Sequence, residues 1–179
     1  IHMLKDLHPV AYGNPTNGCS LRESPDQILE AISNGSNLHV TFADLQTTYK
    51  ALKVLQEMDS GLSVSIAGPL EQVFIMAVDL GMSPDSVLLD LGVFGPDPGM
   101  ERYVAEVVSL CGHMRVSPVL VREAARWVSQ GSMTTDEASS TIGRVCRCGC
   151  FNTKVTAAIL QEEVDSRLAE RENIREESK

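Results

Sequence analysis

Cys111-Gly112-His113 and Cys146-Arg147-Cys148-Gly149-Cys150-Phe151 are the two stretches around which the rest of the chain is organised. They hold four of the five cysteines and one of the four histidines. Thiolate and neutral imidazole are the ligands that zinc and iron–sulfur clusters prefer, and two short ligand groups separated by helices can close a metal cage. The sequence therefore predicts a site for a zinc ion or a 4Fe-4S cluster at Cys111, His113, Cys146, Cys148 and Cys150.

The spacing within these groups leaves two other interpretations open. Zinc sites usually have two residues between paired cysteines, whereas a single residue separates the ligands here. Alternate residues reach one metal from a tight turn but not from a strand, and Gly112 and Gly149 can supply such turns. The second interpretation is a thiol redox or persulfide role, and the third is that the cysteines are small buried hydrophobes.

Cys19 lies in a different setting. The segment from Leu4 to Leu21 carries prolines, glycines and asparagines without a sustained hydrophobic period, which predicts an irregular lead-in. No residue near Cys19 in the sequence has ligand character, so we expect an isolated thiol, with an extra ligand folded back onto the metal region as the alternative.

The middle of the chain predicts alternating strands and helices. Short β-branched or alternating runs at 38–42, 62–67 and 86–91 are typical of strands, and helical spacing marks 44–58 and 70–80 between them. This order with short loops forms right-handed crossovers. The expected fold class is α/β: a small three-stranded or larger parallel sheet flanked by helices, with a C-terminal helical region that contains Cys and His residues.

A length of 179 residues suits one domain, which we place at 4–179. Within it we expect an N-terminal segment and helix at 4–36, a βαβαβ core at 37–99 and a helical Cys-rich region at 100–179. Capping boxes predict two helix starts, one at Ser24 with Gln27 and one at Thr134 with Glu137. Further helical patterns occupy 100–110, 117–130 and the stretch from 153.

The expected parallel sheet suggests a second site, because ligands of open α/β sheets bind beyond the carboxyl ends of the strands. The loops there are rich in glycine and proline but contain neither a phosphate-binding P-loop nor a dinucleotide fingerprint, so purely structural turns are the alternative. Our candidate residues for a small-molecule cofactor are Gly68, Gly92, Gly95 and Asp97.

Candidates for acid–base chemistry are sparse. Asp44, Asp90 and Asp97 are the carboxylates nearest the expected strand ends. His39 lies on the first expected strand, and we expect its side chain to face polar surroundings, with a catalytic role as the alternative. The sequence offers no conspicuous general base beside the cysteines, so it leaves open whether the protein is an enzyme.

The net charge of −9 and an aromatic content of 4% oppose a nucleic-acid partner, which needs clustered cations and stacking side chains. An odd number of cysteines, and the lack of an apolar signal segment or a membrane-length apolar run, predict a cytoplasmic protein without a membrane role. The charged stretch 161–179 favours a protein partner, a small molecule at the strand ends is a further possibility, and the oligomeric state is open.

The two cysteine stretches resemble the methanogenesis marker protein 8 family. The resemblance rests on the run from Cys111 to Val121, on the run from Cys146 to Asn152 and, more loosely, on the turn Gly92–Gly95. It spans about Leu38 to Asn152. Met114 or Arg115 stands where the family has a glycine.

Several expectations follow from this resemblance. The family's second motif is Cys-x-Cys-Gly-x-Phe-Asn, which implies a ligand set of Cys111, His113, Cys146 and Cys148 with Cys150 as a spare thiol. The resemblance also implies an anaerobic setting and a part in maturing or supporting the methyl-coenzyme M reductase system.

Three functions from different classes fit these patterns. The one we favour is a metal-binding accessory or maturation protein linked to anaerobic methane and methyl-coenzyme M metabolism. The second is an enzyme that uses a metal with an open position, or Cys148 or Cys150 as nucleophile or sulfur carrier. The third is a protein-interaction module with a structural metal.

Overall fold

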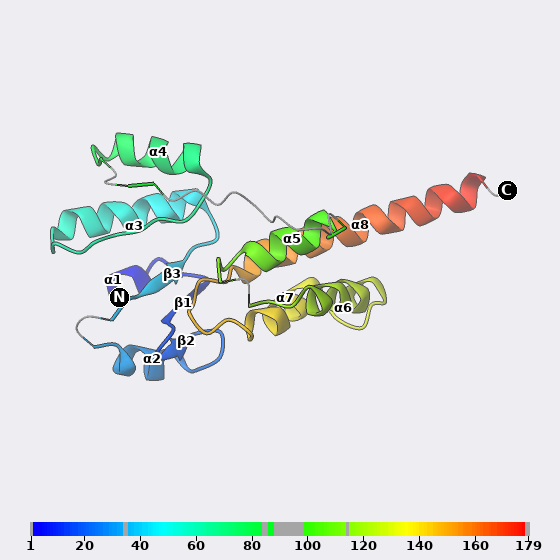
Figure 1. The fold of residues 1–179 in the computed structure, drawn as a ribbon, viewed down its shortest axis with the longest axis horizontal. Helices are drawn as coiled ribbons and strands as arrows, with labels where there is room; N and C mark the ends of the chain where they lie inside the picture. Colours follow the sequence, from blue (N-terminus) through cyan, green and yellow to red (C-terminus); the bar gives the residue numbers. More distant parts are fainter. Residues whose placement is uncertain (1, 34–35, 84–85, 88–98, 114, 178–179) are drawn as a thin grey trace. The chain divides into compact units, whose positions relative to one another are not determined.

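The computed structural model describes residues 2–33, 36–83, 86–87, 99–113 and 115–177 (Figure 1). Its contacts group into two compact units: unit 1 comprises Ile1–His8 and Asp44–Phe94, and unit 2 comprises Pro9–Ala43 and Gly95–Lys179. The single domain at 4–179 stays a prediction. All five cysteines and His39 and His113 belong to unit 2.

Unit 1 contains helices α1 (His2–Lys5), α3 (Leu45–Met58) and α4 (Leu70–Asp79). Asp44 caps α3 through an Oδ1 that accepts a hydrogen bond from the Thr47 amide at 2.8 Å, and α3 ends at Asp59 in the left-handed conformation. The Tyr49 hydroxyl donates to the Asp79 carboxylate and joins α3 to α4. The helices predicted at 44–58 and 70–80 are therefore confirmed.

The strand expected at 62–67 does not form. Residues 61–67 have no regular structure, and Leu62 and Val64 are exposed. Alternating side chains make a strand only where a neighbouring strand accepts its backbone hydrogen bonds, and no such neighbour is found in the described part of unit 1. Of the third expected strand at 86–91, residues 86 and 87 are not in a strand and the others lie outside the described residues.

The sheet belongs to unit 2 and is antiparallel. It contains β1 (Ala11–Asn14), β2 (Gly18–Cys19) and β3 (His39–Thr41) in the order β2-β1-β3. The mixed α and β content and the strand expected at 38–42 are confirmed, but the expectation of a parallel sheet is wrong, because β1 pairs with each neighbour in antiparallel register.

The expectation of an irregular lead-in at 4–21 is also wrong, since this segment contains the end of α1 and all of β1 and β2. Its turn residues close a hairpin instead of breaking structure. The Asn14 Oδ1 accepts hydrogen bonds from the amides of Thr16 and Asn17 at 2.9 and 2.7 Å, and Gly18 has a φ of 92° that suits glycine.

The rest of unit 2 is helical, with α2 (Pro25–Ala31), α5 (Arg102–Ser109), α6 (Pro118–Ser129), α7 (Thr135–Gly143) and α8 (Thr153–Glu177). Both predicted capping boxes are present. Helices α5 to α8 pack together around fully buried apolar side chains: Val104, Val107, Val121, Ala124, Ile142, Phe151 and Leu160. Within the described chain, no helix is both long enough and apolar enough to cross a membrane.

Consecutive helices of this bundle run in opposite directions (Figure 1). Helices α5 and α7 therefore end where α6 and α8 begin. Cys111 follows α5, and the loop Cys146–Cys150 follows α7, so one end of the bundle carries both ligand groups.

Candidate metal centre

The loop Cys146–Cys150 lies directly on the sheet. Gly149 has a φ of 80°, and a side chain there would lie 2.5 Å from the carbonyl carbon of Tyr12 and 2.6 Å from the nitrogen of Gly13. Contact this close between two backbones requires glycine at position 149. The Thr41 hydroxyl donates to the Gly149 carbonyl at 2.8 Å.

The sheet register explains which other ligands the loop meets. Gly13 on β1 pairs with Cys19 on β2 and with His39 on β3. Residues directly opposite each other project from the same face of a sheet, so Cys19 and His39 flank a position that has no side chain. A side chain at Gly13 would overlap the Gly18 carbonyl oxygen and lie 2.6 Å from the Cα of Cys19, so glycine is required there for β1 and β2 to approach.

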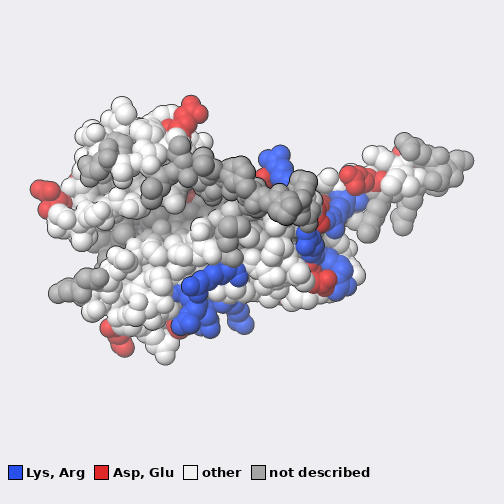
Figure 2. Space-filling view, viewed as in Figure 1, with Lys and Arg blue, Asp and Glu red and all other residues white. Residues whose placement is uncertain are grey.

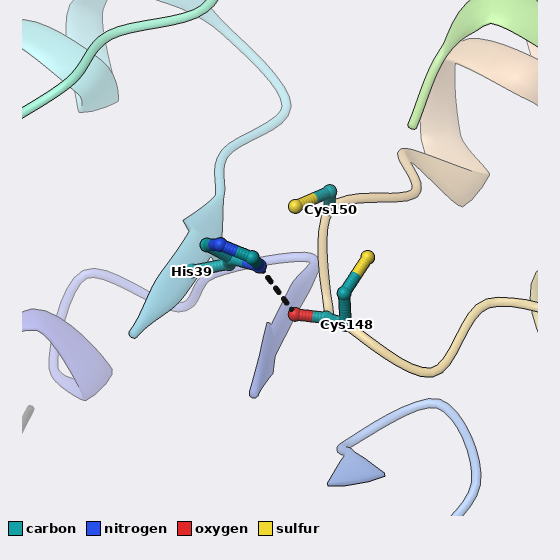
Figure 3. Close-up of side chains that lie close together, drawn as sticks. All are labelled: His39, Cys148 and Cys150. Atoms are coloured by element: carbon teal, nitrogen blue, oxygen red, sulfur yellow. Dashed lines mark hydrogen bonds between the residues drawn. The ribbon is translucent and has the colours of Figure 1, made fainter. Parts of the chain in front are cut away.

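His39 is oriented for metal binding. Its Nδ1 lies 3.0 Å from the Cys148 carbonyl oxygen (Figure 3). Because a carbonyl only accepts hydrogen bonds, Nδ1 is the donor in this contact, and Nε2 is the ring nitrogen left for a metal. Metal-binding histidines are commonly held in this way through the nitrogen that does not bind the metal.

His39, Cys148 and Cys150 form the most compact ligand group among the described residues. One ligand atom from each lies within 4.8 Å of the other two. Figure 3 shows the Cys150 sulfur pointing toward the side on which His39 lies, while the Cys148 carbonyl oxygen faces the imidazole. The Cys148 Sγ is also 3.4 Å from the Nδ1 of His113 and 3.4 Å from the Sγ of Cys146.

Cys146 connects this group to two more thiols. The Cys19 Sγ donates to the Cys146 carbonyl at 3.2 Å, and Cys111 lies in the same buried cluster as Cys146 and Cys148. Hydrogen bonding to Cys146, together with burial, raises the pKa of the Cys19 and Cys111 thiols. Hydrogen bonding of the Cys111 thiol, and then of the Cys19 thiol, to the Cys146 side chain lowers the pKa of Cys146, so this sulfur carries the negative charge most readily.

Burial opposes the thiolate form elsewhere in the cluster. It raises the pKa of Cys148, and it raises the pKa of Cys150 to about 12. Buried thiolates are stable when a cation compensates their charge, and zinc-bound cysteines are deprotonated for this reason. The chemistry of these residues therefore fits a soft metal ion.

The distance between the Cys146 and Cys148 sulfurs fits two thiolates on the same metal ion. Two thiolates on one tetrahedral zinc, each with a Zn–S bond of about 2.3 Å, lie roughly 3.8 Å apart. The Cys146 and Cys148 sulfurs, at 3.4 Å, need to separate only slightly. Thiolates that bind different irons of a cluster have the cluster between them, which requires a larger movement of these side chains.

All five residues predicted as metal ligands lie in this region: Cys111, His113, Cys146, Cys148 and Cys150. One further expectation is corrected: Cys19 is not isolated, because its thiol contacts Cys146. His39 contacts the polar Cys148 carbonyl, and its ligand atom also lies near the sulfurs of Cys148 and Cys150. No local pattern identified either residue, since the contacts of Cys19 and His39 span 127 and 109 residues of sequence.

The cofactor residues expected at the strand ends are not brought together in the described chain. Gly68 precedes α4 in unit 1, and Gly92, Gly95, Asp97 and Asp90 lie outside the described residues. The argument from a parallel sheet no longer applies, because the sheet is antiparallel. Asp44 caps α3, where hydrogen bonds from Thr47 lower the pKa of its carboxyl.

Comparison of this chain with protein-family models, with curated proteins and with solved structures found no match. The chemistry of the cysteine and histidine cluster is therefore the feature that indicates a function.

Proposed function

We propose that this chain is a metal-binding protein whose centre holds zinc, and that it acts as an accessory or maturation factor. The observation that carries the proposal is the placing of one ligand atom each from His39, Cys148 and Cys150 within 4.8 Å of one another. Cys146 or His113 completes four ligands, since each has a ligand atom 3.4 Å from the Cys148 sulfur.

Metal binding accounts for the cluster better than catalysis does. No carboxylate belongs to the ligand group within the described residues, so a general base there would have to be an imidazole, which metal binding would occupy. The Glu23 carboxylate accepts a hydrogen bond from the Cys19 amide at 2.9 Å and holds the backbone of β2. Cys146 and Cys148 are buried, which suits a ligand better than a nucleophile.

A basic surface beside the site favours a protein partner with acidic groups. Arg115, Arg144 and Arg147 are exposed and flank the ligand residues in sequence. Figure 2 shows Lys and Arg side chains gathered on part of unit 2, although the whole chain carries a net charge of −9. Such a local field steers association with an oppositely charged partner.

The link to methyl-coenzyme M metabolism is part of this proposal and rests on the resemblance of the two cysteine motifs. Gel filtration of the metal-loaded protein with purified methyl-coenzyme M reductase components tests it. Comigration that disappears when Arg144 and Arg147 are changed to glutamate supports the link. Separate elution of the wild-type protein would refute the link to methyl-coenzyme M metabolism without contradicting the proposed metal binding.

Elemental analysis and an absorption spectrum of protein purified without oxygen test the metal itself. We expect at least about one zinc per chain and no visible absorbance. His39→Ala should bind zinc more weakly and hold less of it, whereas His2→Ala, which removes an imidazole from unit 1, should keep the zinc content of the wild type. Iron with acid-labile sulfide would mean that the centre holds an iron–sulfur cluster instead of zinc. The absence of both zinc and iron after reconstitution would refute the proposal.

A further inference from the structure

We propose that the centre holds two metal ions that share the thiolate of Cys148. An outer ion takes His39, His113 and Cys150, and an inner ion takes Cys19, Cys111 and Cys146. This inference rests on the proposed metal-binding function and adds to it a second ion and two ligands, Cys19 and His39, that no sequence motif includes.

The inner ligands are assembled by the fold from three separate segments. Cys19 ends the hairpin, Cys111 follows α5, and Cys146 follows α7. Cys19 and Cys146 are 0% and 1% exposed, and Cys111 is 6% exposed. Free cysteines are often buried singly, but here the Cys19 thiol donates to the Cys146 backbone and Cys111 shares the same cluster. Three buried thiols that separate segments bring into one place require an account beyond packing.

The number of donor atoms matches two tetrahedral sites with one shared ligand. The cluster has five cysteine sulfurs and two imidazoles, which is seven donors. Two separate four-coordinate ions need eight donors, and two ions that share one thiolate need seven. One four-coordinate ion would leave three donors unused.

Cys148 is in the position that a shared ligand needs. On one side, its sulfur is 3.4 Å from the Cys146 sulfur, which belongs to the inner group. On the other side, it is 3.4 Å from the Nδ1 of His113 and within 4.8 Å of the ligand atoms of His39 and Cys150. No other donor in the described chain has such contacts with both groups.

The net charge of the centre also favours two metal ions over one. Five thiolates with one divalent ion leave a net charge of −3, whereas two divalent ions leave −1. Excess charge is costly in a buried site, so a single ion would require some of the buried thiols to stay protonated. Two ions allow all five cysteines to act as thiolates.

Zinc content of variants tests the assignment. The wild-type protein should carry two zinc ions per chain. Cys19→Ser and Cys111→Ser should each lose one ion and keep the other, Cys150→Ser should lose the outer ion alone, and Cys148→Ser should weaken both. One zinc per chain in the wild type, unchanged by Cys19→Ser, would refute the second ion and leave the proposed function intact; no metal at all would refute both.

A measurement on the wild-type protein keeps the inference testable if a variant fails to fold. After exchange of zinc for ¹¹³Cd, two ions bridged by a thiolate should give two cadmium NMR signals split by mutual coupling through sulfur. Two signals without coupling would refute the shared Cys148, and a single signal would refute the second ion.

Discussion

The inner and outer halves of the cluster differ in what surrounds them. Cys111 and Cys146 belong to the hydrophobic core formed by α5 to α8, and Cys19 is fully buried beside them. On the outer side, Cys150 and His39 are half-buried and His113 is exposed. A metal ion held inside the core can leave only when the core opens, whereas solvent reaches the ligands of the outer ion directly. The inner ion should therefore stabilise the fold, and the outer ion should exchange.

Removal of the metals should have the largest effect and should occur in two steps. A mild chelator should take the outer ion with little loss of stability. Complete removal should lower the free energy of unfolding by about 4 kcal/mol where free metal had exceeded its Kd by roughly a thousandfold. The Tm should then fall by roughly 8–16 °C, measured by calorimetry alongside a chromogenic zinc indicator. Release in a single step would contradict the difference between the halves.

Gly149→Ala should have the next largest effect, because both halves depend on the contact between the Cys146–Cys150 loop and β1. The new methyl group would lie 2.5 Å from a backbone atom of Tyr12, at a φ of 80°. Left-handed strain of about 1–2 kcal/mol and overpacking of about 1–3 kcal/mol should add together. Chemical denaturation measures the loss of stability.

Gly112→Ala is the matched control for this substitution. Gly112 has a φ of 65°, but nothing lies within 4 Å of an added methyl group. Only the strain of about 1–2 kcal/mol applies to it. Equal losses for the two variants would show that the loop moves away from the sheet without cost.

The two outer histidines separate metal binding from folding. His113→Ala and His39→Ala should each weaken binding of the outer ion at least about tenfold, because each removes a ligand. His39→Ala should also lower the free energy of unfolding of the apoprotein by about 1 kcal/mol, since it removes the hydrogen bond to Cys148. Competition with a zinc indicator and denaturation of the apoprotein measure the two effects. Equal stability of the two apoproteins would contradict the positioning role of His39.

The sequence predicted those parts of the fold and site that depend on neighbouring residues. Ser24 with Gln27 and Thr134 with Glu137 mark helix starts through contacts three residues apart. The cysteines at 146, 148 and 150 act together because one tight loop carries them. Such patterns contain the physical cause of the structure they predict.

Such local patterns could not predict which distant segments pair or contact one another. The run at 62–67 alternates as a strand should, yet alternation does not supply a partner for its backbone. Conversely, the turn residues of the lead-in concealed β1, whose partner β3 lies more than 20 residues away. Cys19 and His39 joined the cluster through this pairing, because both are in register with Gly13. A ligand set completed across a sheet needs knowledge of the register, which periodicity does not contain.

The smallest effect should come from Thr134→Ala, at the end of α7 far from the ligands. Thr134 accepts a hydrogen bond from the Glu137 amide, and its own amide donates to the Glu137 carboxylate at 2.9 Å. Loss of this cap should lower the free energy of unfolding by about 1 kcal/mol, and Thr135→Ala, one residue further into the helix, should change it less. Zinc content should be unchanged in both, because the other end of α7 leads to Cys146. Loss of zinc in the Thr134→Ala variant would mean that metal retention follows overall stability, and the distinction between an inner and an outer ion would then lose its basis.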